Sequence, residues 1–339
     1  MSRGSIERWN LVSIAGAVAA IVAVACLSTA PLFVDGALLN RLTALFIYIM
    51  LALTWNALAG YAGLVSIGQQ VFFGLGAYVT VRLSAAGVSI FAAFFIAALL
   101  VAAFAYPLSI AMLRLKQGEF AIGMWVIAEL AYLVVKLDPL IQGETGTSLL
   151  ALNAYSPGLR HTLIYLTALA SMTVVVLVLY MLLRSRFGIA IQAIRDSEEA
   201  AASVGVRVEA IKRLVFLFSA FGAALAGSLW LGIAITFQPA PFFSVQWTAY
   251  MIFMVLVGGI GSFEGALLGA FVFFVVETWF GGTGVWYLIG LGSVALAFAL
   301  VLPRGIWGQI DQRWGVQLLP IGYRLKTLAA ETTAPSDHR

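Results

Sequence analysis

The sequence predicts an all-α, polytopic integral membrane protein with about ten transmembrane helices, within a range of eight to ten. Of the 339 residues, 62% are hydrophobic and only 10% are charged, whereas soluble domains carry about 25% charged residues. The few charges also leave six uncharged runs of 23 to 50 residues. Because a helix that crosses the hydrocarbon layer needs about 20 apolar residues, the two longest runs are expected to hold two spans each.

Ten candidate spans result when the long runs are divided at glycine, proline and polar clusters. In chain order they cover residues 11–33, 42–59, 71–83, 90–113, 120–135, 162–183, 214–236, 247–260, 265–280 and 285–302. The third and the eighth are short for a complete crossing, so we expect broken or re-entrant segments there. The first is longer than the apolar core of a secretory signal and is expected to remain as an uncleaved helix.

The basic residues predict how these spans are oriented. With the amino terminus inside, 15 lysines and arginines fall on the cytoplasmic side and 4 on the other, which is the bias that the positive-inside rule describes. We therefore expect both termini in the cytoplasm, with a cytoplasmic amino terminus over 1–10, a transmembrane domain over 11–302 and a cytoplasmic tail over 303–339. Within the domain, 184–213 is the long inside loop and 136–161 is the long outside loop.

A glycine-rich polar break interrupts the 40-residue uncharged run at residues 60–70. Irregular backbone at membrane depth is tolerated only where it is buried in protein or faces water, so this segment can line a solute pathway. A tight cytoplasmic turn, followed by close helix packing at Gly74 and Gly76, fits the same residues. Both interpretations stay open at this point. The candidate pathway residues are Gly60, Tyr61, Gly63, Ser66, Gln69, Gln70 and Phe73.

Two carboxylates, Glu129 and Glu277, lie inside the predicted spans. Intramembrane acids are costly and are usually functional or paired. Glu277 lies near the end of its span, where an interfacial position explains it. Glu129 lies deeper, so it joins the candidate pathway. A proton-coupled carrier is expected to show a further deep acid and a histidine or basic partner, but His161 and His338 fall in a loop and in the tail.

The inside loop contains a second candidate site. Ser197 can cap a short helix, and the acids that follow it oppose the positive end of the helix dipole. Gly205 suits the end of such a helix. A solvated surface helix and a docking element for a cytoplasmic partner both fit this pattern. The candidate docking residues are Arg195, Asp196, Ser197, Glu198, Glu199, Ala200 and Gly205.

Several kinds of chemistry lack the residues that they need. None of the four lysines follows a glycine, so the chain has no Walker A loop and any dependence on ATP must come from another chain. No group of His, Cys, Asp or Glu has metal-ligand spacing, and Cys26 is the single cysteine. With two histidines, the chain offers little for acid–base catalysis on a lipid-linked substrate. We expect no enzymatic activity, no metal, no bound cofactor and no nucleic-acid partner.

Five blocks in the sequence carry a resemblance to a known family. They are 60–68 with 72–78, 114–122 with Glu129, 184–188 continuing through 193–196 to Gly205, 258–262 with 265 and 269–270, and 303–305. Together they extend over about three quarters of the chain. In this order the blocks resemble the inner-membrane permease subunits of the branched-chain amino acid ABC importer family, and among them the M-type subunit.

This resemblance implies a helical permease domain that pairs with a second, similar permease in the bacterial inner membrane. It also implies two cytoplasmic ATPases, which would bind ATP and magnesium, and a periplasmic solute-binding protein that delivers the substrate. The inside loop would then dock into an ATPase groove, since Glu199, Ala200 and Gly205 match the family's Glu-Ala-Ala-x-x-x-Gly core. The proline that closes the longer importer motif is absent.

Two departures from the family bear on the substrate. Gln69 and Gln70 stand where many relatives carry a histidine and a small residue, and 142–146 replaces the usual double-glycine loop with its aspartate. Branched-chain amino acids are therefore the default substrate class, because relatives also import urea and short amides. The alternative function is an ion-coupled secondary transporter of small solutes, for which Glu129 would be essential.

Overall fold

The computed structural model describes residues 4–7, 11–314, 318–319 and 324–327. Within these ranges nine helices are long and apolar enough to cross a membrane, which confirms an all-α, polytopic membrane protein. The main helices of these nine spans are α1 (Leu11–Thr29), α2 (Gly36–Asn56), α4 (Ile90–Met112), α5 (Gln117–Lys136), α6 (Pro157–Arg184), α9 (Val208–Ala234), α11 (Gln246–Gly258), α12 (Phe263–Phe280) and α13 (Val285–Val301). A shorter helix, α3 (Gln70–Ala85), is not among the nine.

Short elements connect the long helices. They are the helices α7 (Arg186–Asp196), α8 (Glu198–Ser203), α10 (Pro239–Phe242) and α14 (Gly305–Trp314), the 3-10 turns η1 (Ala30–Leu32), η3 (Leu150–Ala154) and η4 (Gly281–Thr283), and the π-helix η2 (Ala57–Tyr61). Two antiparallel strand pairs complete the fold: β1 (Gly4–Glu7) with β4 (Arg324–Thr327), and β2 (Thr147–Ser148) with β3 (Thr236–Phe237).

Several helices begin earlier than the charge pattern predicts. The second span was expected at 42–59, after Arg41, but α2 begins at Gly36 and continues through η2 to Tyr61. The Asp35 side chain caps α2 by accepting a hydrogen bond from the Leu38 backbone N–H at 3.1 Å. Likewise α9 begins at Val208 rather than 214. Charged residues near the membrane surface thus lie within the first turns of helices and do not mark where those helices begin.

The centre of the bundle is formed by α2 and α9, which are the most buried of the long helices. Small residues bring α3 against α9 backbone to backbone. A Cβ atom added to Gly76 would lie 2.0 Å from the Ala224 carbonyl oxygen, and one added to Gly227 would lie 1.9 Å from the Phe73 carbonyl oxygen. Such close packing through small residues is typical of membrane helices. The packing interpretation of Gly76 is therefore consistent with the structure.

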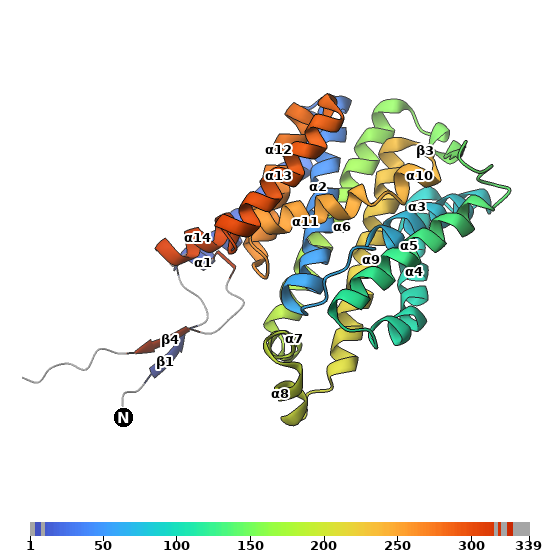
Figure 1. Cartoon of the computed structure of the whole chain (residues 1–339). Coiled ribbons are helices and arrows are strands. Elements are labelled where there is room, and N and C mark those ends of the chain that lie inside the picture. Colours follow the sequence, from blue (N-terminus) through green and yellow to red (C-terminus); the bar gives the residue numbers. More distant parts are fainter. Residues whose placement is uncertain (1–3, 8–10, 315–317, 320–323, 328–339) are drawn as a thin grey trace, which may run out of the picture.

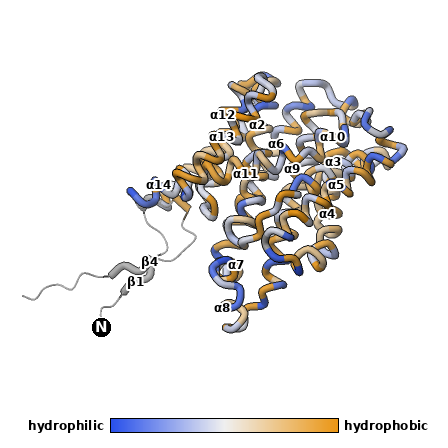
Figure 2. Tube along the Cα trace, in the orientation of Figure 1, coloured by the Kyte–Doolittle hydropathy of each residue, from blue (hydrophilic) through white to orange (hydrophobic). Residues whose placement is uncertain are grey.

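The outer helices expose apolar side chains, as a lipid-facing surface requires. Few residues of α1 and α13 are buried, and the hydropathy colouring shows hydrophobic residues along the long helices (Figure 2). Hydrophilic residues gather on α7 and α8, which project from one end of the bundle (Figures 1 and 2). We call the end of the bundle that carries α7 and α8 the α7–α8 end. We call the end that carries residues 137–156 the loop end.

Candidate functional site

The predicted break at 60–70 begins at the α7–α8 end and returns into the bundle. It starts in the π-helix η2 and turns at Gly63, whose φ of +70° favours glycine. Helix α3 then begins at Gln70, directly after Gln69, whose side chain hydrogen-bonds Ser219. Ser219 lies eleven residues beyond the start of α9, or about 16 Å at the rise of an α-helix. The break is thus both a turn at one end and an irregular segment in the interior, and α3 is a short helix of 16 residues.

Neutral polar side chains meet where the break joins α3. The Gln69 amide N–H donates to Ser219 Oγ at 2.7 Å, and Ser219 Oγ donates to the Thr54 carbonyl oxygen at 2.9 Å. Thr248 Oγ1 donates to Gln70 Oε1 at 2.5 Å. We call Thr54, Gln69, Gln70, Ser219 and Thr248 the polar cluster. All five are buried, and they come from α2, α3, α9, α11 and the break.

One acceptor of the polar cluster has no hydrogen-bond partner among the described residues. Gln69 Oε1 is buried and unpaired, and leaving a buried polar atom unpaired costs about 1–3 kcal/mol. One helical turn beyond Gln69 in the sequence, the buried Phe73 ring packs on Trp247, with ring centroids 4.1 Å apart. Gln69, Gln70 and Phe73 are therefore all buried, the two glutamines in hydrogen bonds and Phe73 among aromatic rings.

Ser66 and Tyr61 are buried as well, and they have different surroundings. The Ser66 carbonyl oxygen accepts a hydrogen bond from Trp55 Nε1 at 3.0 Å, and Ser66 Oγ accepts one from the Gly68 backbone N–H at 3.3 Å. Ser66 thus shapes the backbone of the break. Tyr61 lines a cavity of about 210 Å³ near the α7–α8 end, together with Gln192, Gly261, Ser262, Phe263, Glu264, Trp307, Gly308, Asp311 and Leu319.

A buried amide that the sequence analysis did not single out joins the break to a second glycine loop. Asn56 donates from Nδ2 to the Ser262 carbonyl oxygen at 2.9 Å and accepts at Oδ1 from the Gly261 backbone N–H at 2.8 Å. A Cβ atom added to Gly60 would lie 2.5 Å from that same Gly261 nitrogen. A lone amide in an apolar run is the signal that could have identified Asn56, because polar groups in membrane helices are costly.

Glu129 does not join the other candidate pathway residues. It lies on the exposed face of α5, between Trp125, Val126, Leu130 and Leu133, whose side chains are also exposed. Within the part of the chain that the structure describes, no hydrogen bond or ion pair involves its carboxylate. The structure therefore separates this acid from the buried polar cluster.

The inside loop folds into two short helices joined at Ser197. Ser197 Oγ accepts a hydrogen bond from the Ala200 backbone N–H at 3.3 Å and so caps α8. Gly205 follows α8 with a φ of +88°, the left-handed geometry that ends many helices. Glu198 pairs with Lys212 at 2.6 Å, which attaches α8 to α9. Glu199 and Ala200 are exposed.

Arg195 differs from the other candidate docking residues because one of its hydrogen bonds is directed toward the bundle. Its Nη1 donates to the Gly60 carbonyl oxygen at 3.0 Å. Its Nε and Nη2 also face Asp196 Oδ1, each at 3.4 Å. Asp196 itself is exposed. The candidate docking residues therefore divide into an exposed group around α8 and one arginine that contacts the break.

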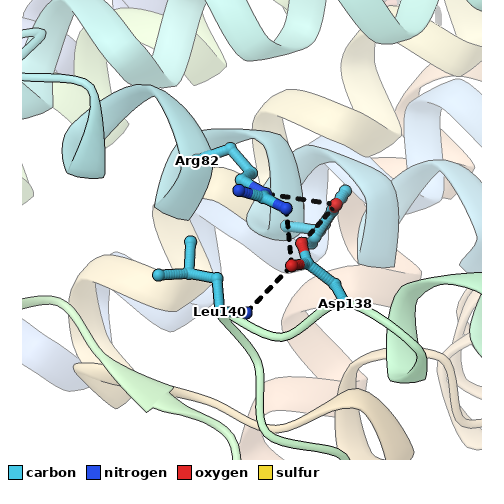
Figure 3. A network of polar contacts seen from close by, with 4 residues as sticks. Arg82, Asp138 and Leu140 are labelled. Carbon is cyan, nitrogen blue, oxygen red and sulfur yellow. Dashed lines mark hydrogen bonds and ion pairs between the residues drawn. The ribbon is translucent and has the colours of Figure 1, made fainter.

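Charged side chains fix the loop end. Asp138 Oδ1 pairs with Arg82 Nη2 at 2.5 Å and accepts from the Leu140 backbone N–H at 2.9 Å, while Oδ2 accepts from the Tyr78 hydroxyl at 2.6 Å (Figure 3). Burial raises the pKa of Asp138, but the hydrogen bonds from Tyr78, Leu140 and Arg82 outweigh it and hold this pKa below its ordinary value. A second pair joins Lys136 to Glu144 at 2.8 Å.

Comparison with known proteins places the chain in a family of membrane transport proteins. The family described as "Branched-chain amino acid transport system / permease component" matches residues 37–303. The high-affinity branched-chain amino acid transport system permease protein LivM of Escherichia coli strain K12 is 26% identical over 315 residues, which cover 84% of this chain and 74% of that protein. LivM of Salmonella typhimurium strain LT2 is 26% identical over 303 residues, which cover 81% of this chain and 71% of that protein.

No solved structure matches the chain significantly. The family match covers well over half of the sequence, and it includes the break, the polar cluster and the loop that carries α7 and α8. The chain is a multi-pass membrane protein and belongs to the family of branched-chain amino acid transport system permease components.

Proposed function

We propose that this chain is the transmembrane permease subunit of an ATP-binding-cassette importer in the bacterial inner membrane. It moves branched-chain amino acids, or a similar small polar solute, and the energy comes from separate ATPase subunits. The observation that carries this proposal is the capped, exposed helix α8 at one end of the bundle, with the Glu199-Ala200-Ala201 sequence and Gly205 in the left-handed conformation. The relatives named above support the substrate class.

The shape of the α7–α8 end supports docking of an ATPase. Helix α8 is fixed to the bundle by the Lys212–Glu198 pair and by buried Ala201, so its position is defined. Glu199, Ala200 and Val204 remain exposed. A force applied to this surface would reach α7 and α9, which directly precede and follow α8. The end that carries α7 and α8 is then the cytoplasmic one, in agreement with the basic residues.

The buried polar cluster is the best candidate for contact with solute during transport. Amide and hydroxyl groups can hydrogen-bond the ammonium and carboxylate groups of a zwitterion without adding a net charge to the membrane interior. The cluster is closed in this conformation, as one state of an alternating-access cycle requires. Motion of α3 against α9 and α11 would open it.

The exposed face of α5 supports a second permease subunit as partner. A carboxylate at this depth is costly against lipid, so a face that holds Glu129 among exposed apolar residues needs protein or water over that acid. A second, similar permease packed on α5 would place Glu129 at the boundary between the two subunits. A periplasmic binding protein would then deliver solute at the loop end.

Reconstitution in lipid vesicles tests the proposal. The chain, its partner permease, the ATPases and the binding protein are expected to accumulate radiolabelled leucine only with hydrolysable ATP on the ATPase side. Omission of the ATPases is the matched control. Accumulation by the chain alone under a proton or sodium gradient, abolished by Glu129→Gln, would instead establish the ion-coupled alternative and contradict the proposal.

A further inference from the structure

The α7–α8 segment lies near the start of the break, and the polar cluster lies at its end. One side chain, that of Arg195, connects the α7–α8 segment to the break. Arg195 extends from the last turn of α7 and donates through Nη1 to the carbonyl oxygen of Gly60, 3.0 Å away. Gly60 lies in η2, where the helical hydrogen-bonding pattern ends. Carbonyl groups in the last turn of a helix lack partners within the helix, and a guanidinium group is well suited to fill that need.

The same guanidinium lies against the second glycine loop. A Cβ atom added to Gly261 would be 2.9 Å from Arg195 Nη1 and 3.1 Å from the Gly60 carbonyl oxygen. Asn56 binds the same loop through the Gly261 N–H and the Ser262 carbonyl oxygen. The end of η2, the glycine loop and the end of α7 therefore meet in one junction, with Arg195 as its contribution from α7.

From this junction a short length of chain leads to the polar cluster. Gly60 and Gln69 are nine residues apart, and Trp55 holds the intervening segment through the Ser66 carbonyl oxygen. Gly68 is fixed against α5, because a Cβ atom added to it would lie 1.9 Å from the Met124 carbonyl oxygen. A displacement of Gly60 thus acts on a segment that is packed on both sides and that ends at Gln69.

We propose that Arg195 is a positioning residue that couples movement of the α7–α8 segment to the break, and through the break to the polar cluster. This inference rests on the proposed function and gives it a specific mechanical connection. It also separates Arg195 from its neighbours in sequence: Glu199 and Ala200 present the docking surface, whereas Arg195 transmits the displacement to the pathway. Arg195 is therefore not required for the ATPases to bind.

The test compares Arg195→Gln and Arg195→Lys with Arg207→Gln, which removes an exposed arginine of the same loop. All are reconstituted with the ATPases, the partner permease and the binding protein. We expect Arg195→Gln to retain ATPase co-purification and ATP hydrolysis. The number of ATP molecules hydrolysed per leucine imported should rise by about tenfold or more, because a hydrogen bond from a charged group is lost. Arg195→Lys, which can still donate to Gly60, should give an intermediate ratio. Arg207→Gln should match wild type.

The outcomes distinguish this inference from the proposed function. Failure of the wild-type complex to import leucine with ATP would contradict the proposed function. Wild-type import together with an unchanged ratio in Arg195→Gln would contradict the coupling role alone. Loss of ATPase co-purification in Arg195→Gln would also overturn it, because Arg195 would then be a docking residue.

Discussion

The two ends of the bundle are held together by different interactions. At the loop end, ion pairs fix the chain: Arg82 with buried Asp138, and Lys136 with Glu144. At the α7–α8 end, buried Ile191, Ile194 and Ala201 pack the loop against the bundle. Its polar contacts include the ion pair between Lys212 and Glu198 and the hydrogen bond from Arg195 to the Gly60 carbonyl oxygen. The first arrangement suits a surface that keeps its shape, and the second suits a segment that moves while remaining attached.

Glycine geometry extends this comparison, because left-handed glycines occur at both ends. Gly205, after α8, has a φ of +88° and no atom within 4 Å of an added Cβ. Gly146, at the loop end, has a φ of +76°, but an added Cβ would lie 2.0 Å from the Phe237 carbonyl oxygen. The chain is therefore packed against β3 at Gly146, whereas the turn after α8 leaves space for a partner. Gly143, also at the loop end, has a φ of +68° and open space around it, so the contrast concerns the two turns and not every glycine at each end.

The largest expected effect is at Gly205. Replacing it with glutamate forces a left-handed conformation that costs about 1–2 kcal/mol for residues with a side chain, and it places a charge on the proposed docking surface. We expect Gly205→Glu to abolish ATP-driven uptake and ATPase co-purification, with expression unchanged. Gly282→Glu, at a glycine with equally open space and no positive φ, is the control. Normal uptake in Gly205→Glu would remove the distinction between the two ends.

The second effect concerns the polar cluster that lies between the ends. Gln69→Leu removes the hydrogen bond to Ser219 while Ser219 keeps its bond to Thr54. We expect a large decrease in the maximal uptake rate and a small decrease in melting temperature. Gln238→Leu, which changes an exposed glutamine, should leave uptake as in wild type. Unchanged uptake and substrate range in Gln69→Leu and Gln70→Leu would show that the break does not line the pathway.

The third effect is on stability and concerns the loop end. Asp138→Asn removes the charge of a buried carboxylate and weakens its ion pair and hydrogen bonds. We therefore expect a melting temperature several degrees lower in detergent, in keeping with a decrease of about 1–3 kcal/mol in the free energy of unfolding. ATPase co-purification should stay normal, since it depends on the other end. Glu209→Gln, which removes the charge of an exposed carboxylate 3.9 Å from Arg213, is the control. An Asp138→Asn protein that is fully stable but loses the ATPases would reverse the comparison.

The pH dependence of stability provides a smaller effect. Because the pKa of Asp138 in the folded protein is below its ordinary value, its contribution to stability is present above about pH 4 and is lost as the pH falls through the lowered pKa. The melting temperature of wild type should therefore decrease below pH 4 more steeply than that of Asp138→Asn. Parallel curves for the two proteins would show that Asp138 does not fix the loop end.

The smallest effect is at the exposed pair between Lys136 and Glu144. Lys136 and Tyr132 hydrogen-bond Glu144 and hold its pKa below the ordinary value, but exposed pairs contribute about 0–1 kcal/mol. We expect Glu144→Gln to change the melting temperature by one or two degrees at most. A decrease in melting temperature as large as that of Asp138→Asn would show that the burial of Asp138 does not make its ion pair more stabilising than the exposed pair.

The sequence predicted the membrane class and the position of the break, since both depend on local composition. Long uncharged runs require helices in lipid, and glycines among polar residues require irregular backbone. The helix cap at Ser197 and the turn at Gly205 were predicted for the same local reason. The starts of α2, α5, α6, α9 and α12 were placed two to six residues too late, because charges near the membrane surface do not coincide with caps, whereas α1, α4 and α13 begin at the predicted residues.

Contacts between residues far apart in sequence were beyond such reasoning. Asn56 and Gly261, 205 residues apart, and Arg195 and Gly60, 135 residues apart, are hydrogen-bonded pairs. Each depends on which helices are neighbours, and uniformly apolar spans carry little information about that. For Glu129, the sequence indicated the depth of the residue within its span. It did not indicate that the residue lies on the exposed face of α5.

By itself, the sequence determined that the chain lies in a membrane, where its long apolar runs are interrupted, and which loop carries a short capped helix. These properties follow from local hydropathy, backbone preference and capping. Only the tertiary structure decided that Gln69 and Gln70 are buried beside Ser219 and Thr248, that Asp138 fixes the loop end, and that Arg195 faces the break. Those outcomes depend on which faces of the helices pack together, and packing through small residues and buried hydrogen bonds is set by the whole bundle.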